Sequence, residues 1–220
     1  MALHDEKYEI QKAVLIIIGR LSYSIPGVVT NAVRQLILDL LRWLEYSRET
    51  TTIVDSVKLL GLAIHSTSSL IEAYVNPVFE LLVNQLKDMK LGKNDSLSLW
   101  IDKIRIAYID TLSLLSEVGT PALKKHYDVL MPIIIELLKP NNDLREAALG
   151  LLHSYSYCTG YVIQPYLQYV NLMDILLNQH NKNGNTTYTL NDRVMRCIGV
   201  LGAIDPFVYN NNMFISSLSS

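Results

Sequence analysis

Apolar residues recur every three or four positions along almost the whole chain, which is the period of one face of an α-helix. The strict alternation that marks a β-strand is missing. The sequence therefore predicts an almost entirely helical protein. The first apolar stripe is Ile10, Val14, Ile17 and Leu21, and the second, after a break at residues 24–27, is Val29, Val33, Leu36, Leu40 and Trp43.

The predicted helices come in pairs that are separated by turns and polar stretches. We expect helical pairs at residues 6–46, 50–88, 102–139 and 142–180, followed by a partial unit at 190–207. Two polar stretches rich in Gly, Asn, Ser and Lys, 89–101 and 181–189, are predicted to be loop insertions, and 208–220 a frayed tail. The chain is thus expected to be one domain over residues 1–220, with about four and a half repeats.

Several helix starts carry capping signals. Thr120 and Pro121 are placed as the N-cap and the first helical residue of one helix. The second helix of the fourth unit is expected to run from about Val162 to Gln179. Capping-box spacing recurs in two further pairs, Ser69 with Glu72 and Asp143 with Glu146.

Equivalent positions of the repeated units carry similar residues. Pro77 and Pro132 share one position in the second helices, which predicts a tolerated kink in each. One position of the first helices is mostly small, as close helix packing prefers; it holds Gly19, Gly61, Ser116, His153 and Gly202. Helical pairs that repeat every 40–47 residues or so are the signature of HEAT and armadillo arrays. We therefore expect an all-α fold, an α–α superhelix of this class.

Composition agrees with a folded array. Half of the 220 residues are hydrophobic, only 18% are charged, and mean hydropathy is +0.20, whereas disorder requires low hydrophobicity and high net charge. The longest apolar run, residues 13–18, is far shorter than the roughly 20 residues of a membrane span. The first residues lack the basic leader of a secretory signal. A cytoplasmic location is expected, with any contact to endomembranes made through partners.

The position of the apolar run has a further implication. A complete array carries a polar outer face on its terminal repeats, but residues 13–18 lie in the first predicted helix. The fifth unit also lacks a convincing second helix. We therefore expect the chain to be a segment that is cut from, or docked within, a longer array.

Charge, cysteine and histidine usage favour neither catalysis nor nucleic-acid binding. The net charge is −2 and no basic block is present, which disfavours a phosphate-backbone partner. Cys158 and Cys197 lack a CxxC partner and are predicted to be free, buried thiols. The five histidines are scattered one per unit, without the i, i+4 spacing of a metal site, and no glycine-rich phosphate loop occurs. We predict no catalytic residue, no metal site and no cofactor.

The remaining candidate for function is the surface, because helical arrays present extended faces to protein partners. Trp100 and Tyr188 flank the predicted loops and are the first candidates for partner contact. Trp43 continues a core stripe, and the glycines Gly199 and Gly202 are expected to allow close helix packing. The tyrosines of the fourth unit have no interleaved basic residues and are predicted to pack with their hydroxyls at the rim; they are Tyr155, Tyr157, Tyr161, Tyr166 and Tyr169.

Two stretches of the last two units have a distinctive amino-acid sequence. Residues 159–178 read TGYVIQPYLQYVNLMDILLN, in which Gly160–Tyr161 is expected to be the turn between helices, and residues 196–206 read RCIGVLGAIDP. This text resembles the HEAT array of the target of rapamycin (TOR) Ser/Thr kinases, of the phosphatidylinositol-kinase-related group. The matching residues are predicted to be structural; they are Gly160, Tyr161, Pro165, Tyr166, Tyr169, Arg196, Gly199, Leu201, Gly202, Asp205 and Pro206. Upstream the likeness thins but is expected to cover the whole chain.

The chain also departs from the family wording. Val170 stands where the family tends to have proline, Phe207 replaces a tyrosine, and the 181–189 loop is longer. What the resemblance implies is a non-catalytic scaffold segment of the N-terminal HEAT array, ahead of the FAT and kinase domains. In that family the array supports dimerisation and binds accessory subunits that select substrates, Raptor-like ones in TOR complex 1 (TORC1) among them. Kinase motifs match no position here.

Two alternatives stay open at the level of sequence. The first is a free-standing HEAT or armadillo adaptor of importin or phosphatase-scaffold type. A sealed, polar C-terminal face would favour this alternative. The second is an enzyme whose polar residues converge only in the folded chain. The identity of partners, the binding face, the oligomeric state and regulation are not encoded in any motif that we recognise.

Overall fold

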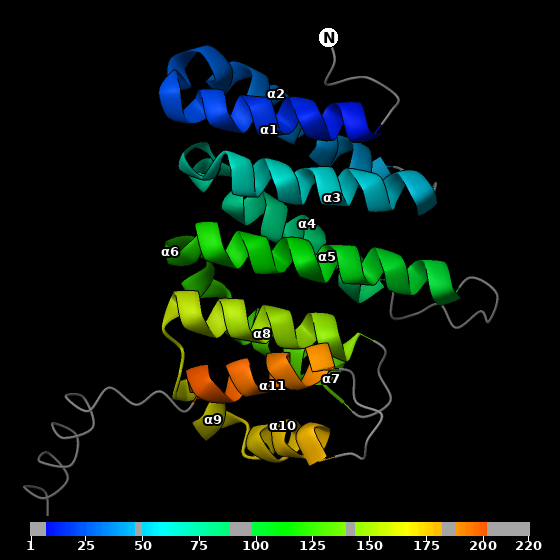
Figure 1. Ribbon diagram of the computed structural model, residues 1–220, viewed down its shortest axis with the longest axis vertical. Coiled ribbons are helices and arrows are strands. Elements are labelled where there is room, and N and C mark those ends of the chain that lie inside the picture. Colours follow the sequence, from blue (N-terminus) through cyan, green and yellow to red (C-terminus); the bar gives the residue numbers. More distant parts are fainter. Residues whose placement is uncertain (1–7, 47–49, 89–97, 140–143, 182–187, 202–220) are drawn as a thin grey trace, which may run out of the picture.

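The structure is a computed structural model that describes residues 8–46, 50–88, 98–139, 144–181 and 188–201. Within these ranges every regular element is a helix. The helices stack one below another into an elongated array with α1 and α2 at one end and α9 to α11 at the other (Figure 1). The predicted all-α solenoid is confirmed, while the division into repeats stays a prediction.

One layer of the array consists of long helices that lie side by side. They are α1 (Tyr8–Ser24), α3 (Thr50–Ser66), α5 (Ser98–Val118), α8 (Arg145–Thr159) and α11 (Tyr188–Leu201). Each of them packs along the next in that order, although the chain leaves the layer between any two of them. A helix in the middle of this layer therefore has a neighbour on both sides.

The second layer is made of more broken helices behind the first. It contains α2 (Pro26–Tyr46), α4 (Val75–Asp88), α6 (Thr120–Leu123), α7 (Tyr127–Leu137), α9 (Gln164–Gln168) and α10 (Leu172–Asn181), with the single-turn 3-10 helices η2 (Ser68–Leu70), η3 (Glu72–Tyr74) and η5 (Lys124–His126). Helix α2 packs on α1 and α3, α4 on α5, α7 on α8, and α10 on α11. The apolar faces of the two layers enclose one continuous core.

Small residues let the long helices approach closely, as the sequence predicts at two positions of the repeated column. A Cβ on Gly19 of α1 would lie 2.6 Å from the Cβ of Ser66 in α3. A Cβ on Gly61 of α3 would lie 3.1 Å from Oγ1 of Thr111 in α5. The Thr111 hydroxyl donates a hydrogen bond of 3.2 Å to the carbonyl oxygen of Val57, which ties α5 to α3.

The predicted capping at Thr120 is wrong. Gly119 occupies the cap position of α6, and the Thr120 hydroxyl instead donates to the carbonyl oxygen of Ser116, 3.0 Å away in the preceding turn. Pro121 is the second residue of α6, one position later in the helix than predicted. Ser69 lies inside η2 and not at a helix cap, and its side chain is outside what the structure describes, so the Ser69–Glu72 box stays a prediction. Asp143 lies outside the described residues.

Three predicted boundaries also differ from the structure. The helix expected over residues 162–179 is divided, because the chain turns at Tyr169 between α9 and α10. Residues 98–101 of the predicted first insertion belong to α5, and α10 and α11 extend into both ends of the second. Pro77 lies in the first turn of α4, where no helical bond is lost, whereas Pro132 lies inside α7.

Helix α1 is oriented differently from the prediction. Among its described side chains, Leu15, which is 1% exposed, and Ile18 are buried, whereas Ile17 of the predicted stripe is 55% exposed. In α2, Leu44 is buried and Trp43 faces outwards. Both helices carry apolar residues on more than one face, so the sequence period does not identify the inner face. Of the helices described, none is long and apolar enough to cross a membrane.

Candidate functional site

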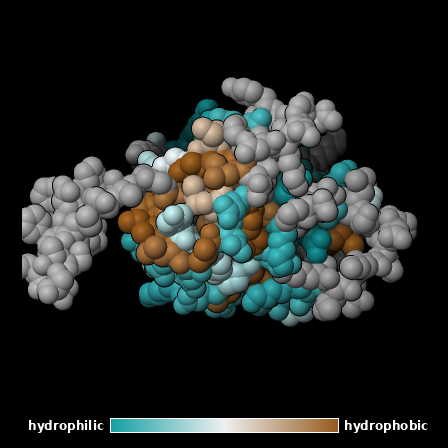
Figure 2. Space-filling view, turned by 90° about the horizontal axis from the view of Figure 1, so that it is seen from below, coloured by the Kyte–Doolittle hydropathy of each residue, from teal (hydrophilic) through white to brown (hydrophobic). Residues whose placement is uncertain are grey.

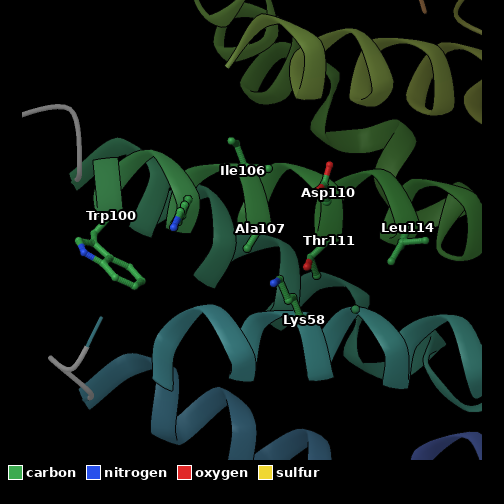
Figure 3. Close-up of a pocket in the computed structure, with 9 residues that line it drawn as sticks. Lys58, Trp100, Ile106, Ala107, Asp110, Thr111 and Leu114 are labelled. Atoms are coloured by element: carbon green, nitrogen blue, oxygen red, sulfur yellow. The ribbon is translucent and has the colours of Figure 1, made fainter. Parts of the chain in front are cut away.

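A groove of about 500 Å³ runs between α3 and α5 on the layer of long helices (Figure 3). Lys58 and Gly61 of α3 line one side. The other side comes from one face of α5, whose residues follow each other at helical spacing: Trp100, Lys103, Ile106, Ala107, Asp110, Thr111 and Leu114.

The floor of the groove is apolar. Figure 3 shows Ala107, Thr111 and Leu114 pointing from α5 towards α3. Gly61 faces them, and any larger residue there would press against Thr111 and Leu114. The Thr111 hydroxyl is already engaged by the backbone of α3. What is left for contact is therefore mostly hydrocarbon, with Trp100 at one end.

Two lysines border this floor. Lys103 places its ammonium nitrogen 4.5 Å from the centre of the Trp100 ring, a cation–π contact. Lys58 lies on the opposite helix and reaches towards α5 (Figure 3). Asp110 is the single acidic residue of the lining, and its carboxyl group points away from α3 (Figure 3).

The surroundings of Asp110 explain its electrostatic state. Burial raises the pKa of its carboxyl group, the nearby positive charges of Arg193 and Lys58 lower that pKa, and the negative charge of Glu146 raises it. The net pKa shift is upwards because burial is the largest of these effects.

Two other hollows lie on the described surface. One of about 660 Å³ separates α2 from α4 and includes Arg42, Glu45 and Glu80 among its lining residues. The other, of about 310 Å³, lies between α8 and α11. Its arginines are already paired: Arg193 Nε is 3.4 Å from Oε1 of Glu146, and Arg196 Nε is 2.8 Å from Oδ2 of Asp192.

Ionisable side chains do not gather into a reactive cluster in the part of the chain that the structure describes. No group of three His, Cys, Asp or Glu side chains there is placed to hold a metal ion. His126 stacks on Phe79 with ring centres 4.2 Å apart and has a nitrogen 3.1 Å from Oδ1 of Asn76. His153 stacks on Tyr157. These two histidines therefore make packing contacts.

Both cysteines are free, as predicted. The Cys197 thiol is buried and donates to the carbonyl oxygen of Leu149, 3.2 Å away in α8. Burial raises its pKa to about 12. Cys158 is half-buried, and burial together with Glu117 raises its pKa as well. Neither thiol has the lowered pKa of a nucleophile.

Comparison with known proteins gives the same family along the whole chain. The family described as the serine/threonine-protein kinase mTOR domain matches residues 162–217. The chain is 31% identical over 214 residues to the serine/threonine-protein kinase TOR of rice (Oryza sativa subsp. japonica), covering 96% of this chain. It is 31% identical over 209 residues to the kinase TOR2 of Saccharomyces cerevisiae, covering 94% of this chain, and 31% identical over 216 residues to the kinase mTor of Drosophila melanogaster, covering 96%.

This chain belongs to the target of rapamycin family. The resemblance seen in its last two units is confirmed, and it continues upstream as expected. The chain spans about 8% of the length of each of these curated relatives.

The residues that match the TOR family form a turn at the end of α8 and packing contacts between α8 and the second layer. Gly160 ends α8 with a φ of +77°, a left-handed conformation that favours glycine. The Tyr161 hydroxyl donates to the carbonyl oxygen of Lys124, 3.2 Å away. Pro165 is buried in the first turn of α9, and Tyr169 packs against the core. The predicted turn at Gly160–Tyr161 is confirmed.

Other residues of the TOR-family wording lie elsewhere. Leu201 is buried, and Arg196 pairs with Asp192 on the surface. The close packing predicted at Gly199 is not found, because this glycine is exposed and a Cβ there would meet nothing within 4 Å. Three further residues of the wording, Gly202, Asp205 and Pro206, lie outside the described residues.

The tyrosines of the fourth unit divide into two groups. Tyr155 is buried and donates to the carbonyl oxygen of Leu123 at 3.2 Å. Tyr161 packs against Tyr127, with ring centres 4.6 Å apart. Tyr157 and Tyr166 are exposed and do not pack into the core as predicted, although Tyr157 stacks on His153. The first group joins the two layers, while the second is available at the surface.

Of the two predicted partner residues, Trp100 lies at the groove and is 40% exposed. Tyr188 begins α11, and its side chain lies outside what the structure describes. Sequence reasoning missed Lys58 and Lys103. Spacing along α5 could have pointed to Lys103, which follows Trp100 by three positions. Lys58 could not be found this way, because it depends on how α3 aligns with α5.

Apolar side chains are also exposed at both ends of the array. At the first end they are Ile10, Ile16, Ile17 and Leu21 of α1, with Ile25 and Val28 beyond it. Figure 2 shows the other end, where hydrophobic surface gathers over α9 to α11. The exposed apolar residues there are Ile163, Tyr166, Leu167, Val170, Leu177 and Met195.

Proposed function

We propose that this chain is a non-catalytic helical-repeat segment of a TOR-type Ser/Thr protein kinase, and that it contributes protein-binding surface to the kinase assembly. The observation that supports this proposal is the sequence match to TOR kinases. Nearly the whole chain aligns with TOR kinases, yet it corresponds to about 8% of their length. A stack of helices with an open groove suits contact with proteins, as extended helical arrays generally do.

The exposed ends of the array support a place within a longer array. Contiguous exposed apolar surface is uncommon on a free-standing protein and marks contact sites. Ile17 and Leu21 on α1, and Leu167 and Val170 beside α9, would be covered by preceding and following helical layers. The expected partners are accessory subunits of a TORC1-like complex, a second copy, or the rest of the parent chain, in the cytoplasm.

The free-standing adaptor of importin or phosphatase-scaffold type is not favoured. The relatives reported above are TOR kinases, and apolar side chains are exposed on the end helices that the structure describes, where an adaptor would carry a polar cap.

The function can be tested in a full-length TOR kinase that carries this segment. We expect replacement of the segment by a flexible linker to remove at least one accessory subunit from the purified complex. Phosphorylation of a short peptide substrate, measured per molecule of folded kinase, should be retained within about threefold, because the segment supplies no reacting group.

A result of the opposite kind would contradict the proposal. If all subunits stayed bound while peptide phosphorylation was lost, the segment would act on the chemistry and not on assembly. The isolated chain provides a further check: incubated with Mg-ATP and the peptide, it should transfer no phosphate.

A further inference from the structure

The three hollows described above differ in which charged side chains they leave unpaired. The hollow between α8 and α11 has its arginines bound to carboxylates. The hollow between α2 and α4 mixes Arg42 with Glu45 and Glu80, so it has no clear charge preference. The groove between α3 and α5 combines an apolar floor with two lysines. It is the hollow with a defined chemical character.

The apolar part of the α3–α5 groove fits one large hydrophobic side chain. Ala107 carries only a methyl group on the floor, and Trp100 and Leu114 lie at the two ends of the lining (Figure 3). Trp100 is 40% exposed in the first turn of α5 although it is among the side chains that gain most from burial. An anchor residue placed beside it would bury both surfaces at once.

The charged part of the groove fits acidic groups. Within the described ranges, neither Lys58 nor Lys103 has a carboxylate at ion-pair distance. Lys103 contacts the Trp100 ring. Lys58 interacts electrostatically with Asp110, but not at ion-pair distance. With Asp110 pointing away, the rim has two positive charges on a chain whose net charge is −2. Local positive charge on an acidic protein favours an acidic ligand.

We propose that the α3–α5 groove binds a short acidic peptide segment of a protein partner, with one large apolar side chain seated over Ala107 beside Trp100 and flanking carboxylates beside Lys58 and Lys103. The proposal rests on the proposed function and assigns that function's protein contact to a particular surface. A free inorganic anion would meet the lysines but leave the floor and Trp100 uncovered. A neutral apolar peptide would leave both ammonium groups unpaired.

The probe is an array of labelled hexapeptides of the form Asp-Glu-X-X-Asp-Glu, in which X is Leu, Ile, Met, Phe, Tyr or Trp. Binding to the 220-residue chain is measured by fluorescence anisotropy. We expect at least one peptide to bind with a Kd below about 1 mM. The same peptide with Asn-Gln flanks, or with Ala at both X positions, should bind about tenfold more weakly.

Variants of the chain locate the binding site. The double variant Lys58→Glu, Lys103→Glu should weaken binding about tenfold or more, because both rim charges are reversed. Its control reverses two exposed lysines of η5 in the second layer, Lys124→Glu and Lys125→Glu, and should leave the Kd unchanged. Circular dichroism confirms that each variant is folded.

The two tryptophans of the chain give a second matched pair. Trp100→Ala should weaken binding, whereas Trp43→Ala, which removes a similarly exposed ring (37%) from α2, should not. In the Trp43→Phe variant, Trp100 is the remaining tryptophan, and its fluorescence should shift on peptide binding.

Several results would overturn the proposal. They are the absence of binding by every acidic peptide of the array, equal binding of the Asn-Gln peptides, or equal loss of binding in the Lys124/Lys125 control. Inorganic phosphate that competed as well as the peptide would reduce the groove to an anion site and also overturn it. If the peptides fail while linker replacement still removes a subunit, the groove assignment is wrong and the proposed function stands.

Discussion

Helix α5 in the middle of the array and helix α1 at its first end are similarly apolar, but they bury their apolar residues differently. In α5, Ile109, Leu112 and Leu115 are enclosed, because α3 packs on one side of the helix and α8 on the other. In α1, the stripe from Ile10 to Leu21 is open to solvent, since α3 is its single neighbour in the layer of long helices within the described residues. An apolar stripe thus shows that a helix has a face to bury, and the number of neighbouring helices decides whether it is buried.

The largest expected effect compares one residue of α5 with one residue of α1. Leu112→Ala in α5 should lower the free energy of unfolding by about 2–5 kcal/mol, because it leaves a cavity in a closed core. Ile17→Ala in α1 should change it by less than about 0.5 kcal/mol, since the side chain is already exposed. Urea unfolding followed by circular dichroism measures both. Equal losses of unfolding free energy at the two sites would contradict the difference in burial between α5 and α1.

The next effect tests the inner face of α1, which should be as tightly packed as the middle. Gly19→Ala should destabilise the chain by about 1–3 kcal/mol, because its Cβ would meet the Cβ and the backbone oxygen of Ser66. Gly199→Ala in α11 is the control. It meets no neighbour and should stabilise the chain by about 0.5–1 kcal/mol through helix propensity. A neutral Gly19→Ala would mean that α1 packs loosely on both faces.

A smaller effect separates two buried tyrosines that join the layers. Tyr155→Phe should cost about 1–2 kcal/mol, because the carbonyl oxygen of Leu123 loses its donor. Tyr127→Phe should be neutral or slightly stabilising, since the buried Tyr127 hydroxyl has no hydrogen-bond partner among the described residues. Thermal unfolding of the two variants distinguishes these outcomes. A larger loss in Tyr127→Phe than in Tyr155→Phe would reverse the assignment.

The smallest effect is a loss of stability at alkaline pH. Burial raises the pKa of Cys197 from 9.0 to about 12 and that of Tyr108 from 10.0 to about 12. The unfolded chain therefore releases these protons first, so stability is full below about pH 9 and declines as pH rises towards 12. We expect a loss of about 1 kcal/mol between about pH 8 and 10, reduced in Cys197→Ala. A urea midpoint that rose over this range would contradict the burial of these groups in the α8–α11 contact and in α5.

Much of the fold could be predicted from the sequence, because helical period and turn residues are local signals. The glycines that let α1, α3 and α5 approach were found by aligning the repeated units. Thr120 was assigned wrongly because a threonine hydroxyl can bond either forwards as a cap or backwards to the preceding turn, and α5 continues far enough to favour the second. The break at Tyr169 had no clear signal, since the apolar stripe continues across it.

The candidate site was less accessible from the sequence. Trp100 was singled out by its place beside a polar stretch, and Lys103 lies one turn further along the same helix. Lys58 and Gly61 belong to another helical pair, and their position opposite Ala107 depends on the register of α3 against α5. Such a register is set by side-chain packing between neighbouring helices, and the apolar pattern of a single sequence does not contain it.

Hydrogen exchange, measured on the isolated chain and on the same residues in a full-length TOR kinase, tests the central claim most directly. In the isolated chain we predict slow exchange in α3, α5 and α8, and faster exchange in α1, α9 and α10, whose apolar faces are open. Within the full-length kinase, α1 and α10 should gain protection while α5 stays unchanged. If the end helices are as protected as α5 in the isolated chain, or gain no protection in the kinase, the account of a two-sided middle and open ends within a longer array is contradicted.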